Sequence, residues 1–382
     1  MGEIAWPLGL GTRRTGLFTY RGGIHPEGNM PIPRCTMPAL ALTAVILLAA
    51  CGSDNQPPAI TAPGAPSAAE TRIERVTDRL DAPWSIAFAG RTALISERNS
   101  GRILELVGNR TREVGRIDGV RARGEGGLLG IAVRENYLYA FYTTSVDNRI
   151  KRFELQGTAG SYTLGTGRTV LDGVPSANTH NGGRIAFGPD GMLYATTGDA
   201  GVPARAQDLS SLAGKILRML PDGGRPADNP FPGTLVYSYG HRNAQGMAWG
   251  PTGTMYASEF GQSTWDELNE IRPGANYGWP IVEGAGNRAG LTDPLQQWST
   301  ATASPSGIAV VGQQLYIANL RGQRLRVVPL SSPATSTETV VGEYGRLRDV
   351  VATPDGATWI LTNNTDGRGS PRAGDDHILR IY

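Results

Sequence analysis

Four polar segments of the chain carry residues able to do chemistry. The first runs from Asn178 to Arg184 and contains His180, and the short segment from Thr197 to Gly201 contains Asp199. An imidazole with a pKa near 6.5 can accept a proton at neutral pH, and a nearby carboxylate can orient it and stabilise its protonated form. A general base held by Asp199 is one interpretation of these segments, and a structural histidine is the other.

The second and third segments offer a fixed cation and a set of oxygen ligands. Arg242, within the donor-rich run 239–246, could bind a carbonyl or carboxylate, or the loop could only satisfy its own backbone. Runs 259–269 and 274–280 combine carboxylates, amides and glycines, which suit a hard cation such as Ca²⁺. The alternating acidic spacing of an EF-hand is missing.

The fourth group consists of Arg321, Arg346 and Arg348, which we expect at the starts of strands late in the chain. Arginines in such places are ordinarily solvated charges at the rim of a fold. A ligand with several carboxylates would need a set of this kind, because planar guanidinium groups bind carboxylates in a bidentate manner.

A repeated strand–turn–strand pattern must position these segments. An apolar run, a Pro/Gly turn and a second run that usually contains Tyr recur six times. One hairpin cannot cover its own apolar faces, so units of this period stack radially, and about 50 residues per unit suit four-stranded blades. The sequence therefore predicts an all-β, six-bladed β-propeller over residues 71–382, with a β-sandwich as the alternative. The ring would be closed by pairing of 377–382 with 71–76.

Composition and the N-terminal region limit the possible partners. The net charge is +2 without a basic block, which excludes nucleic acid as a main partner. The apolar run 38–50 is too short to span a bilayer, and it ends at Cys51 in a pattern that resembles a bacterial lipobox. We expect residues 1–51 to be a targeting segment, with 1–29 a possible artefact of start-site choice. Residues 52–70 would be a tether, and the protein would be exported and lipid-anchored through Cys51 to the outer face of the cell membrane. An ordinary signal peptide that contains a cysteine is the alternative.

The ordered set of polar segments resembles one family. The runs 180–184, 197–199, 240–246, 266–269 and 276–280 are similar to those of the soluble PQQ-dependent sugar dehydrogenases, which include aldose sugar, glucose and sorbosone dehydrogenases. The resemblance extends from about residue 72 to 382. It implies a propeller that holds pyrroloquinoline quinone (PQQ) over its channel, with PQQ and Ca²⁺ as cofactors.

The resemblance also implies roles for single residues. His180 would take the proton of the sugar C1 hydroxyl while hydride passes to the quinone, Asp199 would support it, and Arg242 would polarise the quinone carbonyl. Glu125 would also touch the cofactor, although members of the family often have Gln there, and it would have to be protonated or to pair with an arginine such as Arg123. The cofactor contacts would be Glu125, Arg242, Asn243, Asn319, Leu320, Arg321, Arg346, Leu347 and Arg348, and the calcium ligands Glu267, Tyr277 and the backbone of Gly261 and Gln262.

The function expected from the resemblance is oxidation of an aldose sugar at C1 to the lactone. Because the sequence has no haem motif, electrons would leave to a separate acceptor, a quinone or a cytochrome. Two alternatives stay open: a calcium-dependent lactonase, and a non-catalytic surface propeller that binds glycans or a partner protein.

Overall fold

The structure is a computed structural model that describes residues 72–382. The predicted targeting segment, the lipidation site at Cys51 and the tether lie outside the described residues. The described part consists of 24 strands and one short 3₁₀ helix, η1 (Pro203–Ala206). No helix within residues 72–382 is long and apolar enough to cross a membrane.

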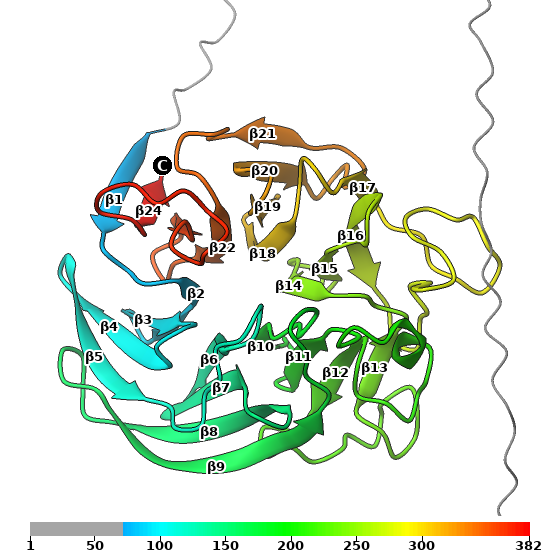
Figure 1. Ribbon diagram of the computed structural model, residues 1–382, viewed down its shortest axis with the longest axis horizontal. Coiled ribbons are helices and arrows are strands. Elements are labelled where there is room, and N and C mark those ends of the chain that lie inside the picture. Colours follow the sequence, from blue (N-terminus) through cyan, green and yellow to red (C-terminus); the bar gives the residue numbers. More distant parts are fainter. Residues whose placement is uncertain (1–71) are drawn as a thin grey trace, which may run out of the picture. The chain divides into compact units, whose positions relative to one another are not determined.

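The strands form six four-stranded antiparallel sheets arranged around a central axis, as Figure 1 shows. The predicted six-bladed propeller is therefore confirmed, and the β-sandwich alternative is wrong. Blade 1 contains β2 (Pro83–Ala89), β3 (Thr92–Glu97), β4 (Arg102–Val107) and β5 (Arg110–Arg116), and blade 2 contains β6 (Leu128–Arg134), β7 (Tyr137–Thr143), β8 (Asn148–Gln156) and β9 (Thr163–Val174). Blade 3 contains β10 (Ile185–Phe187), β11 (Leu193–Thr197), β12 (Lys215–Met219) and β13 (Val236–Tyr239), and blade 4 contains β14 (Ala244–Trp249), β15 (Met255–Glu259), β16 (Trp265–Ile271) and β17 (Gln296–Ser299). Blade 5 contains β18 (Pro305–Val311), β19 (Gln314–Asn319), β20 (Arg324–Pro329) and β21 (Thr337–Thr339), and blade 6 contains β22 (Leu347–Ala352), β23 (Thr358–Thr362), β24 (Ile378–Ile381) and β1 (Ile73–Thr77).

Blade 6 closes the ring with strands from both ends of the described chain. β1 pairs with β24 in antiparallel register, with Ile73 opposite Ile381. In Figure 1 the blue β1 lies beside the red β24. The predicted closure is confirmed, and it removes two strand edges that would otherwise be unpaired.

The sequence repeat corresponds to the innermost strand of each blade. Each of the six aligned apolar residues is buried on such a strand, where it faces a neighbouring blade. The backbones come close together here, and a β-carbon at Gly130 on β6 would overlap the carbonyl of Gly183 just before β10. Glycine therefore recurs directly before the apolar position in three of the six copies. The aligned residues are Ile86, Ile131, Ile185, Met247, Ile308 and Val350.

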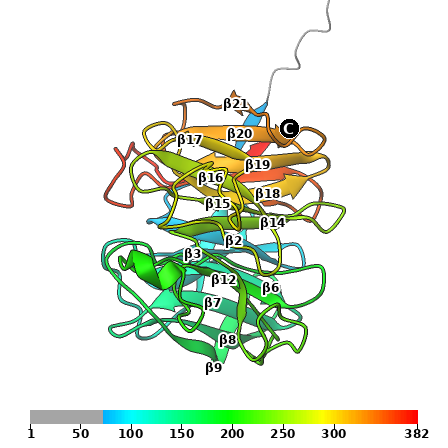
Figure 2. The ribbon, with the colours of Figure 1, turned by 90° about the vertical axis from the view of Figure 1, so that its right-hand side faces the viewer.

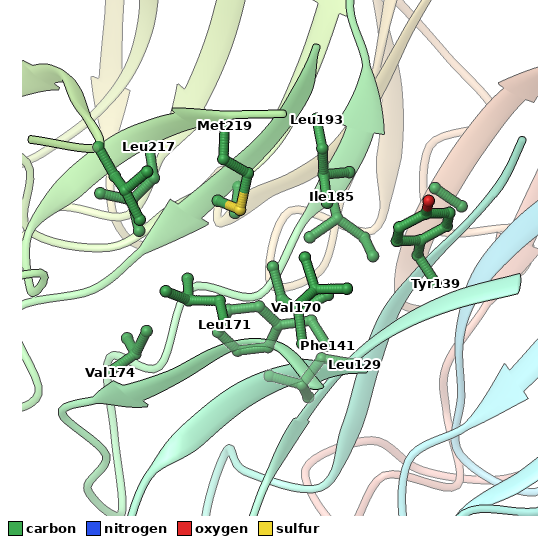
Figure 3. Packing of buried hydrophobic residues seen from close by; sticks show 14 of the residues in the cluster. Leu129, Tyr139, Phe141, Val170, Leu171, Val174, Ile185, Leu193, Leu217 and Met219 are labelled. Atoms are coloured by element: carbon green, nitrogen blue, oxygen red, sulfur yellow. The ribbon is translucent and has the colours of Figure 1, made fainter. Parts of the chain in front are cut away.

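Apolar side chains between adjacent blades form the core. The largest cluster lies between blades 2 and 3, and Figure 3 shows its side chains interdigitating from the two sheets. Successive side chains of a strand point to opposite faces of the sheet. Because neighbouring blades cover both faces, apolar residues occur on both of them. The labelled members of this cluster are Leu129, Tyr139, Phe141, Val170, Leu171, Val174, Ile185, Leu193, Leu217 and Met219.

An ion pair crosses the central channel. Arg184, just before β10, donates to the Asp349 carboxylate on β22 at 2.9 Å, and both side chains are buried. The guanidinium also donates to Ser85 Oγ (3.1 Å) and to the Gln245 carbonyl (3.1 Å), and it stacks on the Trp84 ring at 4.3 Å. Residues of blades 1, 4 and 6 therefore contact one charged group, the guanidinium of Arg184.

Two layers of connecting loops flank the strands, and η1 lies in one of these layers, as the side view in Figure 2 shows. In one of these two loop layers, the loops that precede the innermost strand of a blade lie near the loops that follow the second strand of a blade. All four polar segments singled out in the sequence include residues of these loops. The fold therefore brings residues that are far apart in the sequence to one end of the channel.

Candidate active site

A cavity of about 800 Å³ opens at this end of the channel. Loops of blades 2 to 6 contribute to its wall, each through the segment before the innermost strand or the segment after the second strand. The lining is mainly polar and includes many arginine side chains. The residues that line it are Glu125, His180, Arg242, Asn243, Phe260, Gly261, Gln262, Asp266, Thr300, Ser304, Leu320, Arg321, Gln323, Gly345, Arg346, Asn364, Arg368, Gly369, Ser370 and Arg372.

His180 and Asp199 form a hydrogen-bonded pair at the cavity wall. Nδ1 of His180 lies 2.7 Å from Oδ1 of Asp199, and the carboxylate is fully buried while the imidazole remains 16% exposed. Asp199 also accepts the indole N–H of Trp279 (2.8 Å) and the backbone N–H of Gly201 (2.8 Å). Burial alone would raise the pKa of Asp199, but these hydrogen bonds outweigh it and lower that pKa below its usual value. The carboxylate therefore stays ionised and accepts the N–H of His180 Nδ1.

The backbone around His180 is fixed as tightly as its side chain. His180 has a φ of +58°, in the left-handed region, and its N–H donates to Oε2 of Glu125 at 2.8 Å. A β-carbon at Gly198 would overlap the His180 carbonyl, so only glycine permits the close approach of the two loops. The strained backbone at His180 is thus held by contacts from two other segments.

Arg242 is held in a fixed orientation beside the pair. Its Nε and Nη2 donate to Oε1 of Gln262 (2.9 and 2.7 Å), and Nη1 donates to the Phe260 carbonyl (3.0 Å). The guanidinium also lies over the Trp279 ring, 5.6 Å from its centroid. The adjacent Asn243 accepts the Gly182 N–H (3.0 Å), whereas its buried Nδ2 has no hydrogen-bond partner within the described residues. That amide is a donor without an acceptor at the cavity wall.

The predicted arginine set is only partly brought together. Arg346 lines the cavity directly before β22 and pairs with Asp366 at 3.0 Å, and Arg321 lines it as well. The expectation that all three arginines stand at strand starts is wrong for Arg321, which follows β19. Arg348 on β22 points into the channel, where Nη1 donates to Oε1 of Gln245 (3.2 Å), and it is absent from the cavity lining.

Three further residues assigned to the cofactor occupy different environments. Leu320 lines the cavity. Asn319 ends β19 and is fully buried, with Nδ2 donating to the Ile317 carbonyl at 2.9 Å. Leu347 is fully buried in the apolar cluster between blades 5 and 6. Asn319 and Leu347 are therefore buried behind the residues that line the cavity and do not line it themselves.

Glu125 has a charge partner that the sequence analysis did not identify. Its Oε1 accepts Nη1 of Arg368 at 3.0 Å, across the cavity from the loop that follows β23. Arg123, the partner considered from the sequence, is exposed. The pair links the loop of blade 2 to that of blade 6, and Oε2 of the same carboxylate holds His180. Arg368 is therefore the charge partner of Glu125 at this position.

The charges on the lining favour an anionic ligand. Five guanidinium groups face two carboxyl groups, those of Glu125 and Asp266, which leaves an excess of three positive charges. Asp366 behind the wall has a second arginine, Arg348, at 3.9 Å, so it does not cancel this excess. The arginines that line the cavity are Arg242, Arg321, Arg346, Arg368 and Arg372.

A second, much smaller space adjoins the cavity and contains buried carboxylates. Glu259 and Glu267 lie directly opposite each other on β15 and β16, and both are buried. Burial, and then the charge of Glu259, raise the pKa of Glu267 to about 8. The space between them and Tyr277 is about 10 Å³, enough for one water-sized particle. The buried Oδ1 of Asn269 has no hydrogen-bond donor within the described residues.

The predicted calcium ligands lie around this space. Glu267, Tyr277 and Gly261 line it, whereas Gln262 faces the large cavity. Oε1 of Glu283 accepts the backbone N–H groups of residues 262–265 at 2.7–3.1 Å and so fixes the loop after β15. No three His, Cys, Asp or Glu side chains within residues 72–382 converge on one point. A cation bound here would need backbone or amide oxygens in addition to the two carboxylates.

Some residues of the site could not be assigned from the sequence. Trp279 joins Asp199 to Arg242, but its motif gave no indication of either contact. Arg368 and Arg372 lie on the long loop before β24, and among the many scattered arginines nothing marked these two. The signal that could have suggested them is the presence of several arginines in this one loop, which follows β23, the second strand of blade 6.

Comparisons with known proteins agree with this geometry. The family model described as Glucose / Sorbosone dehydrogenase matches residues 80–379. The aldose sugar dehydrogenase YliI of Escherichia coli is 29% identical over 356 residues, which cover 80% of this chain and 94% of that protein. The PQQ-bound structure of the aldose sugar dehydrogenase of Streptomyces coelicolor is 47% identical with a TM-score of 0.78, covering 82% of this chain and 98% of that one. The apo-form structure of the soluble aldose sugar dehydrogenase of E. coli has a TM-score of 0.71 at 27% identity, covering 82% and 99%. The chain therefore belongs to the glucose/sorbosone dehydrogenase family.

Proposed function

We propose that this protein oxidises aldose sugars at the C1 hydroxyl to the lactone, with PQQ and Ca²⁺ as cofactors. The observation that carries the proposal is the His180–Asp199 pair at the wall of an arginine-lined cavity. Membership of the family supports the dehydrogenase activity, and the PQQ-bound relative at 47% identity supports the cofactor.

The cavity residues fit PQQ. PQQ carries three carboxylates, and the lining has an excess of three positive charges. The buried Nδ2 of Asn243 lacks an acceptor, which oxygen atoms of such a ligand would provide. Arg321, Arg346, Arg368 and Arg372 would hold the carboxylates, and Arg242 with Asn243 would hold the quinone oxygens. When bound, PQQ supplies the acceptor for the hydride that leaves the sugar C1.

The residues of the chain supply the proton chemistry. Oxidation of the C1 hydroxyl releases one hydride and one proton. Asp199 holds the Nδ1 proton of His180, so the lone pair of Nε2 is the site that accepts the hydroxyl proton. The imidazolium formed in this way is stabilised by the buried carboxylate at 2.7 Å.

The small space beside the cavity fits a divalent cation. Two buried carboxylates face each other there, and burial, followed by the charge of Glu259, raises the pKa of Glu267. A Ca²⁺ ion would offset the charges of the two carboxylates, which are the hard oxygen ligands that it prefers. We propose that Glu267 and Tyr277 bind the ion, and that the backbone of Gly261 and Gln262 contributes to a second calcium site towards PQQ.

The test is reconstitution of the full chain. After removal of metals, PQQ is added with and without Ca²⁺, and reduction of a dye is measured with a panel of aldoses. The dye stands in for the external acceptor. We expect dye reduction only with both PQQ and Ca²⁺, and loss of turnover with retained PQQ binding in His180→Gln. Lactone opening without PQQ would support a lactonase, and sugar binding without PQQ affinity would support a binding propeller; either result would overturn the proposal.

A further inference from the structure

A buried ammonium group lies behind the active site, and the proposed reaction does not use it. Lys215, at the start of β12, is 0% exposed. Its Nζ donates to three backbone carbonyls, those of Arg205 (2.8 Å), Ala206 (3.1 Å) and Ala213 (2.7 Å). Arg205 and Ala206 are the last residues of η1, where carbonyl groups lack partners within the helix and favour a positive charge. The three carbonyls form a cage that the ammonium fills.

The cage requires lysine rather than arginine. The chain has 36 basic residues, and all except Lys151 and Lys215 are arginine. An ammonium is a compact point charge whose three N–H bonds diverge towards three acceptors, whereas a guanidinium is planar and presents its donors as a fork. Burial lowers the pKa of Lys215 to about 8, so the ammonium form still predominates at pH 7. In a chain that otherwise uses arginine, this position needs the smaller cation.

The caged carbonyls belong to the segment that carries Asp199. The segment 199–214 starts at Asp199, and its ends are joined by the hydrogen bond from the Gly214 N–H to the Gly198 carbonyl (2.8 Å). Within it, the Ala206 carbonyl accepts the N–H of Gly240 (2.9 Å) as well as the ammonium. Lys215 therefore fixes a point where the segment meets the loop that leads to Arg242.

A second connection runs through Trp279. Gln207, next to the cage, donates from Nε2 to the Trp279 carbonyl at 2.7 Å, and its side chain is paired in both directions with the amide of Asn276. The Trp279 indole N–H in turn donates to Oδ2 of Asp199. Displacement of the segment would therefore move both the backbone that carries Asp199 and the indole that orients its carboxylate.

We propose that Lys215 is a positioning residue. Its ammonium takes the place of a bound cation and holds the segment 199–214. It thereby sets the orientation of His180 through Asp199. The inference rests on the proposed role of His180 as the base. It goes beyond that role, because it assigns the geometry of the base to a cation outside the cavity.

The test compares Lys215→Met and Lys215→Arg with the matched control Lys151→Met, which changes the other lysine, on β8 at a partly exposed site of blade 2. Proton NMR of the full chain without cofactor detects the Nδ1–H of His180 held by Asp199, assigned by its loss in Asp199→Ala. We expect both Lys215 variants to shift or lose this resonance and Lys151→Met to keep it. An unchanged resonance in both Lys215 variants overturns the proposal.

Kinetics with PQQ and sugar give the second measurement. We expect kcat to fall on the order of 10²-fold in Lys215→Met, because a small displacement of a catalytic group has an effect of that size. The affinity for PQQ should change much less, since Lys215 does not line the cavity. A loss of affinity with an unchanged kcat contradicts the positioning role.

Two controls keep the outcome interpretable. If the variants do not fold, hydrogen exchange in the unaltered protein decides: the hydrogen-bonded amides of Asp199, Ala200 and Gly214 should be protected as strongly as those of β12, and fast exchange at these amides overturns the proposal. If the NMR effect occurs but the unaltered protein oxidises no sugar, the proposed function fails while the structural coupling of Lys215 to His180 stands.

Discussion

The ion pair across the channel gives a prediction whose size can be worked out. In Asp349→Asn the carboxylate charge is lost, while the amide oxygen can still accept the N–H of Ile86, which donates to Asp349 Oδ2 at 3.1 Å. Arg184 is then left buried without a counter-charge. Removal of one partner from a buried pair costs about 3–5 kcal/mol, so we expect the free energy of unfolding to fall by that amount.

Two further variants separate the effect of leaving a buried charge unpaired from the effect of replacing aspartate by asparagine. Asp355→Asn removes the partner of Arg380 in the same blade, but this pair is partly exposed, at 29% and 35%, so we expect a loss below about 1 kcal/mol. In the double variant Arg184→Met with Asp349→Asn no unpaired charge remains. We therefore expect it to be more stable than Asp349→Asn alone, because the cost of an uncompensated buried charge is removed.

Urea unfolding at pH 7, extrapolated linearly to water, measures these free energies. The reasoning would be refuted if Asp349→Asn lost less than about 1 kcal/mol, the loss typical of an exposed pair. It would also be refuted if the double variant lost as much as the sum of the two single variants, because the charges would then be uncoupled.

The remaining predictions concern the two carboxylates that hold His180. Because the pKa of Asp199 is lowered in the folded state, its contribution to stability is present above the ordinary carboxyl pKa of about 3.9 and is lost as the pH falls below it. Thermal unfolding of the unaltered protein should therefore depend more steeply on pH below about 4 than that of Asp199→Asn, and equal slopes would contradict this. Glu125→Gln should change the free energy of unfolding by less than about 1 kcal/mol, because the pair with Arg368 is partly exposed and the amide oxygen can still accept the His180 N–H. Glu125→Ala, which removes that acceptor, should be clearly less stable in the same urea assay, and equal stability of the two variants would count against the contact.

The fold could be predicted because its physical cause repeats along the sequence. The six apolar positions from Ile86 to Val350 are innermost-strand residues, and each is buried by the same radial packing. The pairing of His180 with Asp199 was also within reach, since both residues lie beside strands of blade 3, where the distance in sequence limits the distance in space.

Contacts between blades could not be predicted in the same way. The pair formed by Glu125 and Arg368 joins residues 243 positions apart, and its register depends on how two irregular loops cross the cavity. Arg348 is adjacent in sequence to residues of the cavity wall, yet it lies where the pairing of β22 with β23 is irregular, between Leu347 and Asp349, and its side chain bonds to Gln245 in the channel. Lys215 gave no signal, because its partners are backbone carbonyls, which every residue possesses.

The composition of blade 6 has a consequence for how the molecule is made. Its outermost strand, β1, is synthesised before the other strands and its neighbour, β24, after them, so the pairing that places Ile73 opposite Ile381 forms only after almost the whole propeller has left the ribosome. Loop closure over such a distance is slow relative to local hairpin formation. During that interval both strands have exposed edges, which bind other strands readily. Proteolytic removal of β24 from the folded propeller would leave β1 and one edge of β23 unpaired, and the protein would then be vulnerable to association at this one seam rather than over its whole surface.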